Sequence, residues 1–337
     1  MIEAVAVFLA GALLLYVLLG GADFGAGILE MFVNRKTRGQ QKKIINEAMG
    51  PVWEVNHIWL IIAVVILFTA FPKAFSQISV TFHIPLTIML IGIITRGCAF
   101  AFRNYDAYRD QSQKYYSLAF EVSSVLTPFS LGLILGGILL GRINPEADSF
   151  YAAFIDPWFN VFSFTLGIFT CCLVTYIASV YIIGETRKTV LRRQFVYRAK
   201  VAGIVTFIMG ALLIETALYY ESELFSKFYS DYFSMSCVLL TGLIYLPLWK
   251  LLNHRIALLA RLMIGLQVSL IFLAWFKLQY PFIIAPSSQF EFKGFDLYQV
   301  AAPESTLKYL LIALISGSAI IFPAWLYLLR VFKFRSF

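Results

Sequence analysis

The chain consists of long apolar stretches separated by short polar connections. Nine stretches are long enough to cross a bilayer, whose hydrocarbon core of about 30 Å needs about 20 helical residues. They are residues 3–32, 52–70, 79–102, 119–141, 160–184, 200–219, 234–251, 257–276 and 306–330. The stretches are continuous and lack the alternation of β-barrel strands. They therefore predict an all-α integral membrane protein with nine transmembrane helices.

The polar connections contain no Pro- or Gly-rich linker and no segment long enough to form a soluble domain. We therefore expect residues 1–337 to form a single transmembrane domain. The first stretch has no cleavage-site pattern and carries Asp23 deep inside it. This indicates a retained helix rather than a signal peptide.

The composition supports a membrane protein. Hydrophobic residues make up 60% of the chain, charged residues 14% and aromatic residues 17%, whereas soluble domains have about 45–50% apolar and about 25% charged residues. A water-soluble enzyme, a disordered chain and a nucleic-acid-binding domain are excluded. The four cysteines lie in apolar stretches without metal-binding spacing, so we expect small buried side chains there. They are Cys98, Cys171, Cys172 and Cys237.

Lys and Arg residues are unevenly distributed between the two ends of the predicted helices. Of the 27, 19 follow an odd-numbered stretch and 5 follow an even-numbered one. Because cytoplasmic loops are enriched in Lys and Arg, we expect the N-terminus outside and the C-terminus in the cytoplasm. The net charge of +8 then comes from cytoplasmic loops and indicates no acidic partner.

Ionisable side chains inside membrane helices are costly, and they are typical of functional or interior-facing positions. The candidates are Asp23, Glu54, Arg96, Glu121 and Glu215. Two further acids, Glu3 and Glu30, lie near the ends of a stretch. We expect both of these to reach water.

Asp23 and Glu54 both fall in the cytoplasmic half of the membrane according to this topology. A carboxyl group is the usual proton carrier inside a membrane, so both residues are candidates for a proton pathway. For Asp23, the alternatives are a hydrogen bond between helices and an ion pair with Arg96. The small residues around it, including Gly21 and Gly25, favour close helix packing in any case.

Glu54 belongs to a short polar segment that begins at Pro51. Glu54 and His57 are three residues apart and are expected to face the same way. One turn thus carries a carboxylate, the Asn56 amide and an imidazole between Trp53 and Trp59, and we expect Glu54 to be buried against these indoles. Stabilisation of an acid by the helix N-terminus is the alternative explanation.

Only three histidines are present: His57, His83 and His254. His57 lies near the cytoplasmic side, His83 near the external side and His254 in a cytoplasmic loop. No two of them are expected to face each other across one site. We therefore expect that this chain ligates no haem and holds no metal.

Several separated motifs resemble subunit II of the cytochrome bd-type quinol oxidases. They are Asp23-Phe24-Gly25-Ala26-Gly27, the segment Pro51-x-Trp53-Glu54-x-Asn56-x-x-Trp59-Leu60, Leu67-Phe68-x-Ala70-Phe71-Pro72, Arg96 and Arg103 with Phe100 between them, Pro281-Phe282, and Pro286-Ser287-Ser288. The order and spacing of these motifs carry the resemblance. The chain departs from the family pattern at Gly20, where an acid is common, at Val55, where glycine is usual, and at His57, where Glu or Gln is usual.

This resemblance implies two four-helix bundles plus one peripheral helix, and pairing with a haem-bearing subunit I. The complex would carry two haems b and one haem d, or a haem b variant, in subunit I. It would oxidise quinol and reduce O₂ to water in the bacterial cytoplasmic membrane, generating proton motive force by cytoplasmic proton uptake. Some members have a small single-span accessory subunit, and some hold a structural quinone.

For this chain, the resemblance implies no catalytic residue of its own and a proton pathway through Glu54 and Asp23. Trp53, Asn56, His57, Trp59, Arg96 and Arg103 would support that pathway. Arg96 is expected to be buried and to meet an acid, a partner carbonyl or a haem propionate. Arg103 is expected to reach cytoplasmic water.

Two other functions are compatible with the same residues. Nine helices with intramembrane carboxylates would suit a proton-coupled secondary transporter, although transporters place broken helices at the membrane midplane, and these polar residues lie near one side. A purely scaffolding subunit is the other. Co-purification with a haem-bearing partner would discriminate against the transporter, and replacement of Glu54 by Gln would discriminate against the scaffold.

Overall fold

The computed structural model describes residues 1–337 except 34–36, 51–52, 107–110, 145–146, 187, 221–226, 255, 287–291 and 332–337. Within the described ranges, nine helical units are long and apolar enough to span a membrane. Each coincides with one of the nine predicted stretches. The prediction of an all-α protein with nine transmembrane helices is confirmed.

The elements follow one another along the chain as continuous or broken membrane helices with short connecting pieces. In order they are α1 (Ile2–Leu15), η1 (Tyr16–Gly20), α2 (Gly21–Met31), α3 (Arg38–Met49), α4 (Trp53–Asn56), α5 (Ile58–Ala70), α6 (Pro72–Thr81), α7 (His83–Tyr105), α8 (Ser112–Leu140), α9 (Phe150–Phe154), α10 (Val161–Glu185), α11 (Thr189–Tyr219), α13 (Tyr232–Asn253), α14 (Ala257–Gln279), β1 (Phe282–Ile284), β2 (Phe295–Asp296) and α15 (Glu304–Leu329). Strands β1 and β2 pair antiparallel, with Phe282 opposite Asp296.

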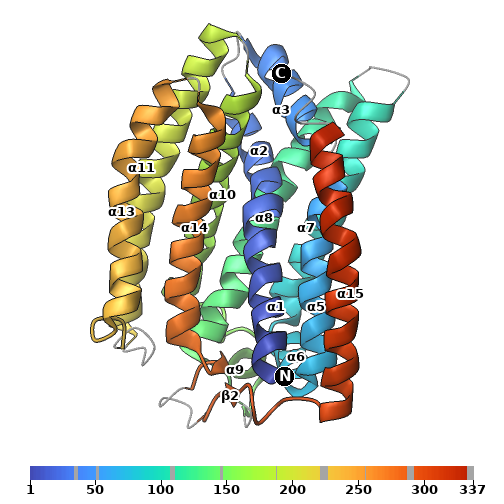
Figure 1. Ribbon diagram of the computed structural model, residues 1–337, viewed down its shortest axis with the longest axis vertical. Helices are drawn as coiled ribbons and strands as arrows, with labels where there is room; N and C mark the ends of the chain where they lie inside the picture. The colour runs from blue at the N-terminus through green and yellow to red at the C-terminus, as the bar shows by residue number, and fades with distance from the viewer. Residues whose placement is uncertain are drawn as a thin grey trace.

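The membrane helices form two groups and one outlying helix (Figure 1). The first group contains the unit α1–η1–α2, the unit α4–α5, α7 and α8; the second contains α10, α11, α13 and α14. Helix α10 joins the groups, because it packs against α2 and α8 as well as against α11 and α14. Helix α15 packs against α5 and α1 at the edge. The expected two bundles with a peripheral helix are therefore confirmed.

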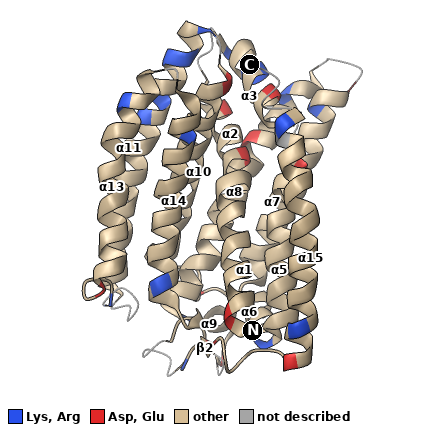
Figure 2. Cartoon of the chain, viewed as in Figure 1, with Lys and Arg blue, Asp and Glu red and all other residues tan. Residues whose placement is uncertain are grey.

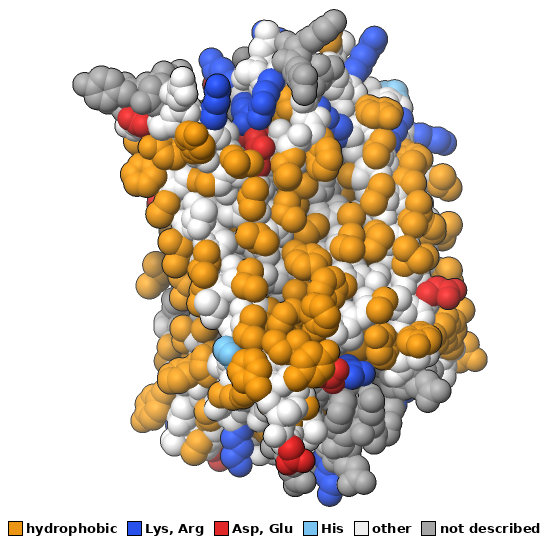
Figure 3. Space-filling model, turned by 180° about the vertical axis from the view of Figure 1, so that it is seen from behind, with side chains coloured by type: hydrophobic (Ala, Val, Ile, Leu, Met, Phe, Trp, Pro, Cys, Tyr) orange, Lys and Arg blue, Asp and Glu red, His pale blue; other side chains and the backbone are white. Residues whose placement is uncertain are grey.

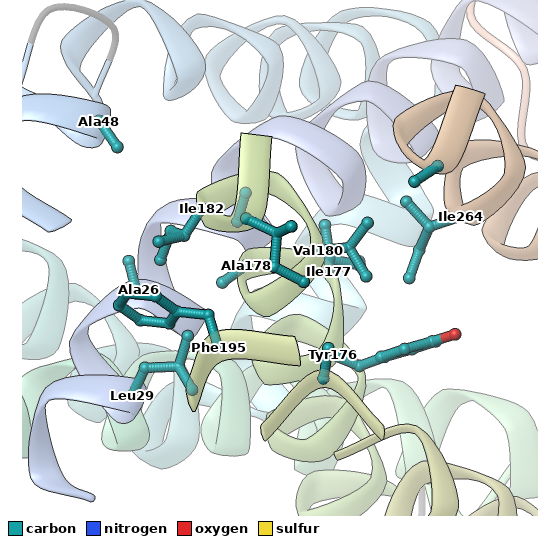
Figure 4. Packing of buried hydrophobic residues seen from close by; sticks show 14 of the residues in the cluster. Ala26, Leu29, Ala48, Tyr176, Ile177, Ala178, Val180, Ile182, Phe195 and Ile264 are labelled. Carbon is teal, nitrogen blue, oxygen red and sulfur yellow. The ribbon is translucent and has the colours of Figure 1, made fainter. Parts of the chain in front are cut away.

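A buried apolar cluster lies where α2, α10, α11 and α14 meet. Figure 4 shows Ala26 and Leu29 from α2 with Tyr176, Phe195 and Ile264 in this cluster. In lipid, small residues and close packing drive helix association more than apolar burial does. Gly25 illustrates this, since a Cβ atom at that position would lie 1.9 Å from the carbonyl oxygen of Val174 on α10. The backbones of α2 and α10 touch there.

The surface shows where lipid or a partner contacts the protein. Apolar side chains form a broad band between two ends that carry charged groups (Figure 3). Lys and Arg gather mainly at the end that holds α3 (Figure 2). Helix α15 ends on this side, whereas α1 begins at the opposite end (Figure 1). This is the arrangement expected for a multi-pass membrane protein with one strongly basic side.

The structure differs from the sequence-based predictions in its helix breaks and extensions. The first membrane unit contains the π-helical segment η1, and the second is interrupted at His57, between α4 and α5. Helices α8 and α11 begin well before their predicted apolar stretches, because helical hydrogen bonding continues beyond the hydrocarbon core that hydropathy detects. Helix α3 is too polar to have been predicted from hydropathy.

The four cysteines are free, as expected, but one of them is not buried. Cys98 is exposed on α7, Cys171 and Cys172 are half-buried, and Cys237 is buried. The expectation of burial is wrong for Cys98, because its face of α7 also exposes Leu90, Ile91 and Ile94. Apolar sequence context does not distinguish a residue that faces lipid from one that faces the protein interior.

Candidate functional site

Asp23 lies at the centre of a polar site inside the first bundle. It is on the first turn of α2 and is fully buried. Asn56, at the end of α4, donates a hydrogen bond through Nδ2 to Asp23 Oδ2 at 2.6 Å. The same amide lies 3.4 Å from the carbonyl oxygen of Leu19 in η1. One amide thus connects the carboxylate, the π-helical segment and the break in the second membrane unit.

Arg96 on α7 is held by neutral groups on the other side of Asp23. It is 2% exposed, and its Nη2 donates to the main-chain carbonyl oxygen of Asp23 at 2.7 Å. Its Nε donates to Ser124 Oγ at 3.2 Å. The guanidinium carbon lies 5.0 Å from the ring centroid of Phe24 and 4.9 Å from that of Phe120. Such cation–π contacts are worth most where water is excluded.

The predicted burial of Arg96 is confirmed, and its partners belong to this chain. Arg96 binds Asp23 through the peptide carbonyl, and the Asp23 carboxylate accepts a hydrogen bond from Asn56 on another helix. Gly27 allows this arrangement, because a Cβ atom there would lie 2.1 Å from Ser124 Oγ. The small residues of the Asp23 motif therefore bring α8 close enough to share Arg96.

The segment from Trp53 to Trp59 separates its polar side chains instead of gathering them. Asn56 points inward to Asp23, whereas Glu54 is exposed on the surface of the chain. The expectation that Glu54 is buried between the two indoles is wrong for this chain. Trp59 packs instead against Phe322 and Trp325 of α15. Pro51, which opens this motif, lies outside the described residues.

His57 occupies the helix break and is enclosed by aromatic rings. Its ring centroid lies 5.7 Å from that of Phe24, 6.2 Å from that of Tyr16 and 6.4 Å from that of Trp53. Tyr16 in turn lies against Gly20, since a Cβ atom at Gly20 would come within 2.9 Å of the Tyr16 ring. Gly20 and His57 are two of the positions at which the sequence departs from the family motifs. Both contact Tyr16.

A second polar group, which we call the α3 charge network, lies at the basic end. It contains Glu30, Arg103, Lys42, Glu121 and Arg38. Arg103 Nη1 lies 2.8 Å from Glu30 Oε2, and Lys42 Nζ lies 3.4 Å from the same oxygen and 2.8 Å from Glu121 Oε1. Arg103 also donates to Asn46 on α3. These contacts fix α3 against α2, α7 and α8.

Two expectations about this end of the protein are wrong. The Glu30 side chain is fully buried instead of reaching water, and the Arg103 side chain is only 7% exposed. The cause is α3, which covers both residues and supplies Lys42. Glu3 is exposed, as expected, and accepts a hydrogen bond from Tyr298 at 2.8 Å. Glu215 is exposed on α11.

The described residues do not fit a haem held by two histidines. His57 precedes α5 and His83 begins α7, so consecutive antiparallel helices place the two at opposite ends of the bundle. Among the described residues, no three His, Cys, Asp or Glu side chains are grouped to hold a metal ion.

Sequence reasoning identified Asp23, Asn56 and Arg96 but missed three residues that complete the two polar groups. Tyr16 gave no signal, since it lies in an apolar run. Ser124 looks like an ordinary small helix residue, and Lys42 lies in a connection. The signal for Lys42 was the helical spacing of polar and apolar residues in 38–49, which hydropathy alone does not detect.

Comparisons with known proteins agree with this fold. A chain of the bd oxidase from Geobacillus thermodenitrificans superposes with a TM-score of 0.80 at 20% identity, covering 98% of this chain and 99% of that one. Cytochrome bd ubiquinol oxidase subunit 2 of Bacillus subtilis is 25% identical over 209 residues, 62% of this chain. Cytochrome bd-I ubiquinol oxidase subunit 2 of Escherichia coli is 24% identical over 212 residues, 60% of this chain.

These two alignments span 60% and 54% of the relatives' own lengths. The family model described as cytochrome bd terminal oxidase subunit II is more extensive, because it matches residues 1–332 of the 337. The chain therefore belongs to the cytochrome bd terminal oxidase subunit II family.

Proposed function

We propose that this chain is subunit II of a quinol oxidase complex of the bacterial cytoplasmic membrane. Together with a haem-bearing subunit I, it would couple quinol oxidation to the reduction of O₂ to water. Family membership supports this proposal, as do the names of the Bacillus and Escherichia relatives, which are called ubiquinol oxidase subunits. The family match does not favour the proton-coupled transporter.

Within that complex, we assign this chain a role in proton uptake from the basic side. Reduction of O₂ consumes protons, and a carboxyl group can deliver them through a membrane protein. The observation that carries the proposal is that an exposed acid and the amide that binds a buried acid lie only two residues apart in the sequence. Glu54 is exposed, and Asn56, two residues later, binds the buried Asp23 carboxylate at 2.6 Å.

The exposure of Glu54 also suits a route between subunits. An acidic side chain at the membrane end of a helix bundle can receive protons from water and pass them along a partner surface. Asp23 lies behind it, held by the Asn56 amide and next to the peptide group bound by Arg96. In this proposal, subunit I carries the haems and the quinol site, and an accessory subunit or a structural quinone would lie outside this chain's polar site.

The test is Glu54→Gln in the purified complex. Glutamine keeps the size and hydrogen bonding of glutamate but cannot exchange a proton in the same way. We expect steady-state O₂ uptake to fall about tenfold or more, and by no more than the roughly 10²–10⁴-fold loss of a removed acid–base group. Haem content in the visible spectrum should remain unchanged.

Glu54→Asp serves as the conservative control and should retain part of the activity. Glu47→Gln is the matched control on the same end of the protein, because Glu47 is exposed and pairs only with Lys43 among the ion pairs of the described residues. A fully assembled Glu54→Gln complex that turns over at the wild-type rate would show that Glu54 only stabilises the helix start.

A further inference from the structure

Two buried polar atoms near Asp23 have no hydrogen-bond partner among the described residues. They are the Tyr16 hydroxyl and His57 Nδ1. Tyr16 is 3% exposed, and its ring centroid lies 6.2 Å from that of His57. A buried polar group without a hydrogen-bond partner destabilises the folded protein, because it has lost its hydration. Two such groups on adjacent rings therefore call for a polar partner that the described residues do not provide.

The backbone around these rings is irregular on both sides. Tyr16 begins the π-helical segment η1, and His57 lies between α4 and α5. Insertions of this kind are frequent at functional sites, because they open the regular packing of helices. The Tyr16 ring folds back over Gly20, where any Cβ atom would collide with it. The absence of a side chain at Gly20 therefore leaves room for the Tyr16 ring in this position.

The groups facing His57 show what could occupy the space. Phe24 and Trp53 pack edge to face with the imidazole, and the Tyr16 ring is its third aromatic neighbour. The other ionisable groups nearby are Asp23, which binds Asn56, Arg96, which binds the Asp23 carbonyl, and Glu54 on the preceding helix α4. A buried water needs two to four polar partners. Tyr16 and His57 can supply two of them.

We propose that Tyr16 and His57 bind ordered water, and that this hydrated pocket carries protons between Glu54 and Asp23. The second half of the proposal rests on the proton role assigned to those two acids. His57 takes a proton at one ring nitrogen and releases one from the other, so its charge is unchanged after each passage and the ring then returns to its first tautomer. The Tyr16 hydroxyl orients the water by donating one hydrogen bond and accepting another.

The first experiment detects the water without measuring activity. Hydroxyl radicals generated by X-rays label buried side chains that contact bound water. In the assembled wild-type complex, we expect Tyr16 to be labelled at least about fivefold faster than Tyr176, which is also buried but packs in a face-to-face stack with Tyr245. Equal, slow labelling of Tyr16 and Tyr176 would overturn the hydrated pocket.

The second experiment measures O₂ uptake by Tyr16→Phe, His57→Phe and Glu54→Gln complexes. We expect His57→Phe to slow turnover at least about fivefold with normal haem content. Because residues of one route are not additive, Glu54→Gln combined with His57→Phe should be no more than about twofold slower than Glu54→Gln alone. His83→Gln, at the opposite end of the bundle, is the matched control and should turn over at the wild-type rate.

The outcomes separate this inference from the proposed function. Slow Glu54→Gln with wild-type rates for Tyr16→Phe and His57→Phe would overturn the link through His57 and leave the role of Glu54 intact. Wild-type turnover of Glu54→Gln would overturn the proton role of both acids, and the labelling of Tyr16 would then still decide whether the pocket holds water.

Discussion

Arg96 and Arg103 show two ways of accommodating a guanidinium group inside one membrane helix. Arg96 is held by a peptide carbonyl, a serine hydroxyl and two aromatic rings. Arg103 is held by the carboxylate of Glu30 and also lies 4.3 Å from the ring centroid of Phe120. Arg103 thus forms a direct ion pair with a buried acid. The two residues should therefore respond differently to changes in their neighbours.

Glu30→Gln should destabilise the assembled complex strongly. The substitution leaves Arg103 and Lys42 without the buried carboxylate that both contact, and removing one partner of a buried pair typically costs about 3–5 kcal/mol. Thermal unfolding of the purified complex measures the loss. Arg103→Leu should be as damaging as Arg96→Leu, because both side chains are buried.

Glu47→Gln is the control for that experiment. Its ion pair with Lys43 spans 3.7 Å between largely exposed side chains, and exposed pairs contribute about 0–1 kcal/mol. We expect no resolvable change in the unfolding temperature. A similar small effect of Glu30→Gln would contradict the conclusion that the α3 charge network fixes α3 to the bundle.

Tyr298 forms hydrogen bonds at the end of the molecule opposite the α3 charge network, and their contribution to stability depends on pH. Its hydroxyl lies 2.6 Å from that of Tyr280 and donates to Glu3 at 2.8 Å. These hydrogen bonds raise the pKa of Tyr298 above its ordinary value. The folded protein therefore favours the protonated hydroxyl, so the contribution to stability is complete below about pH 10 and is lost as the pH rises toward the raised value.

We expect the wild-type complex to unfold at a slightly higher temperature than Tyr298→Phe from about pH 6 to 9, and this difference to shrink above about pH 10. Tyr309→Phe is the control, because Tyr309 is exposed on α15 and none of the hydrogen bonds described for this chain involves it. If the difference between the wild-type complex and Tyr298→Phe grew with rising pH, the raised pKa of Tyr298 would be contradicted.

At the scale of helices, the sequence predicted which segments are membrane helices but not where they break. No proline marks the π-helical segment, and Tyr16 lies in an apolar run with no local sign of irregular structure. The break follows from tertiary packing, since Tyr16 must fold over Gly20 and meet His57 from another helix. The exposure of Glu54 likewise depends on the rotation of α4 about its axis. A helix of four residues is too short for its sequence pattern to predict that rotation.

Gly25→Ala should disrupt the contact between α2 and α10. A Cβ atom at Gly25 would lie 1.9 Å from the Val174 carbonyl oxygen and 2.8 Å from the Ala178 Cβ atom, and a backbone carbonyl cannot move aside as a flexible side chain can. We expect a clearly lower yield of assembled complex and a lower unfolding temperature, on the scale of about 1–3 kcal/mol for overpacking. Size-exclusion chromatography and thermal unfolding measure both effects.

Gly11→Ala is the matched control in the same membrane unit. No atom lies within 4 Å of a Cβ atom at Gly11, and alanine is favoured over glycine within helices by roughly 0.5–1 kcal/mol. This variant should assemble normally and unfold at the same or a slightly higher temperature. Equal losses for both glycine variants would show that any substitution destabilises this membrane unit. The contact between α2 and α10 would then not account for the loss in Gly25→Ala.

At the scale of the whole molecule, the same two helices, α2 and α7, contribute to the α3 charge network and to the Asp23 site. Lys and Arg gather at the end that holds α3 (Figure 2), where Lys42 and Arg103 contact Glu30, which follows Asp23 on α2. The number of membrane helices in the described part of the chain could be predicted from the length of the apolar stretches. The cover formed by α3 could not, because its role depends on salt bridges between segments far apart in the sequence.

The last prediction is the orientation in the membrane, with the basic end facing the cytoplasm. In the structure, α1 begins at one end and α15 ends at the other, which is the end that holds α3 (Figure 1), so the position of one terminus determines that of the other. An alkaline phosphatase reporter is active only outside the cytoplasm. Fused after Phe337, it should be inactive, whereas the same reporter fused after Pro303, in the connection that precedes α15, should be active. The reverse pattern would place the basic end outside. It would also place Glu54 on the external side and remove the argument for cytoplasmic proton uptake.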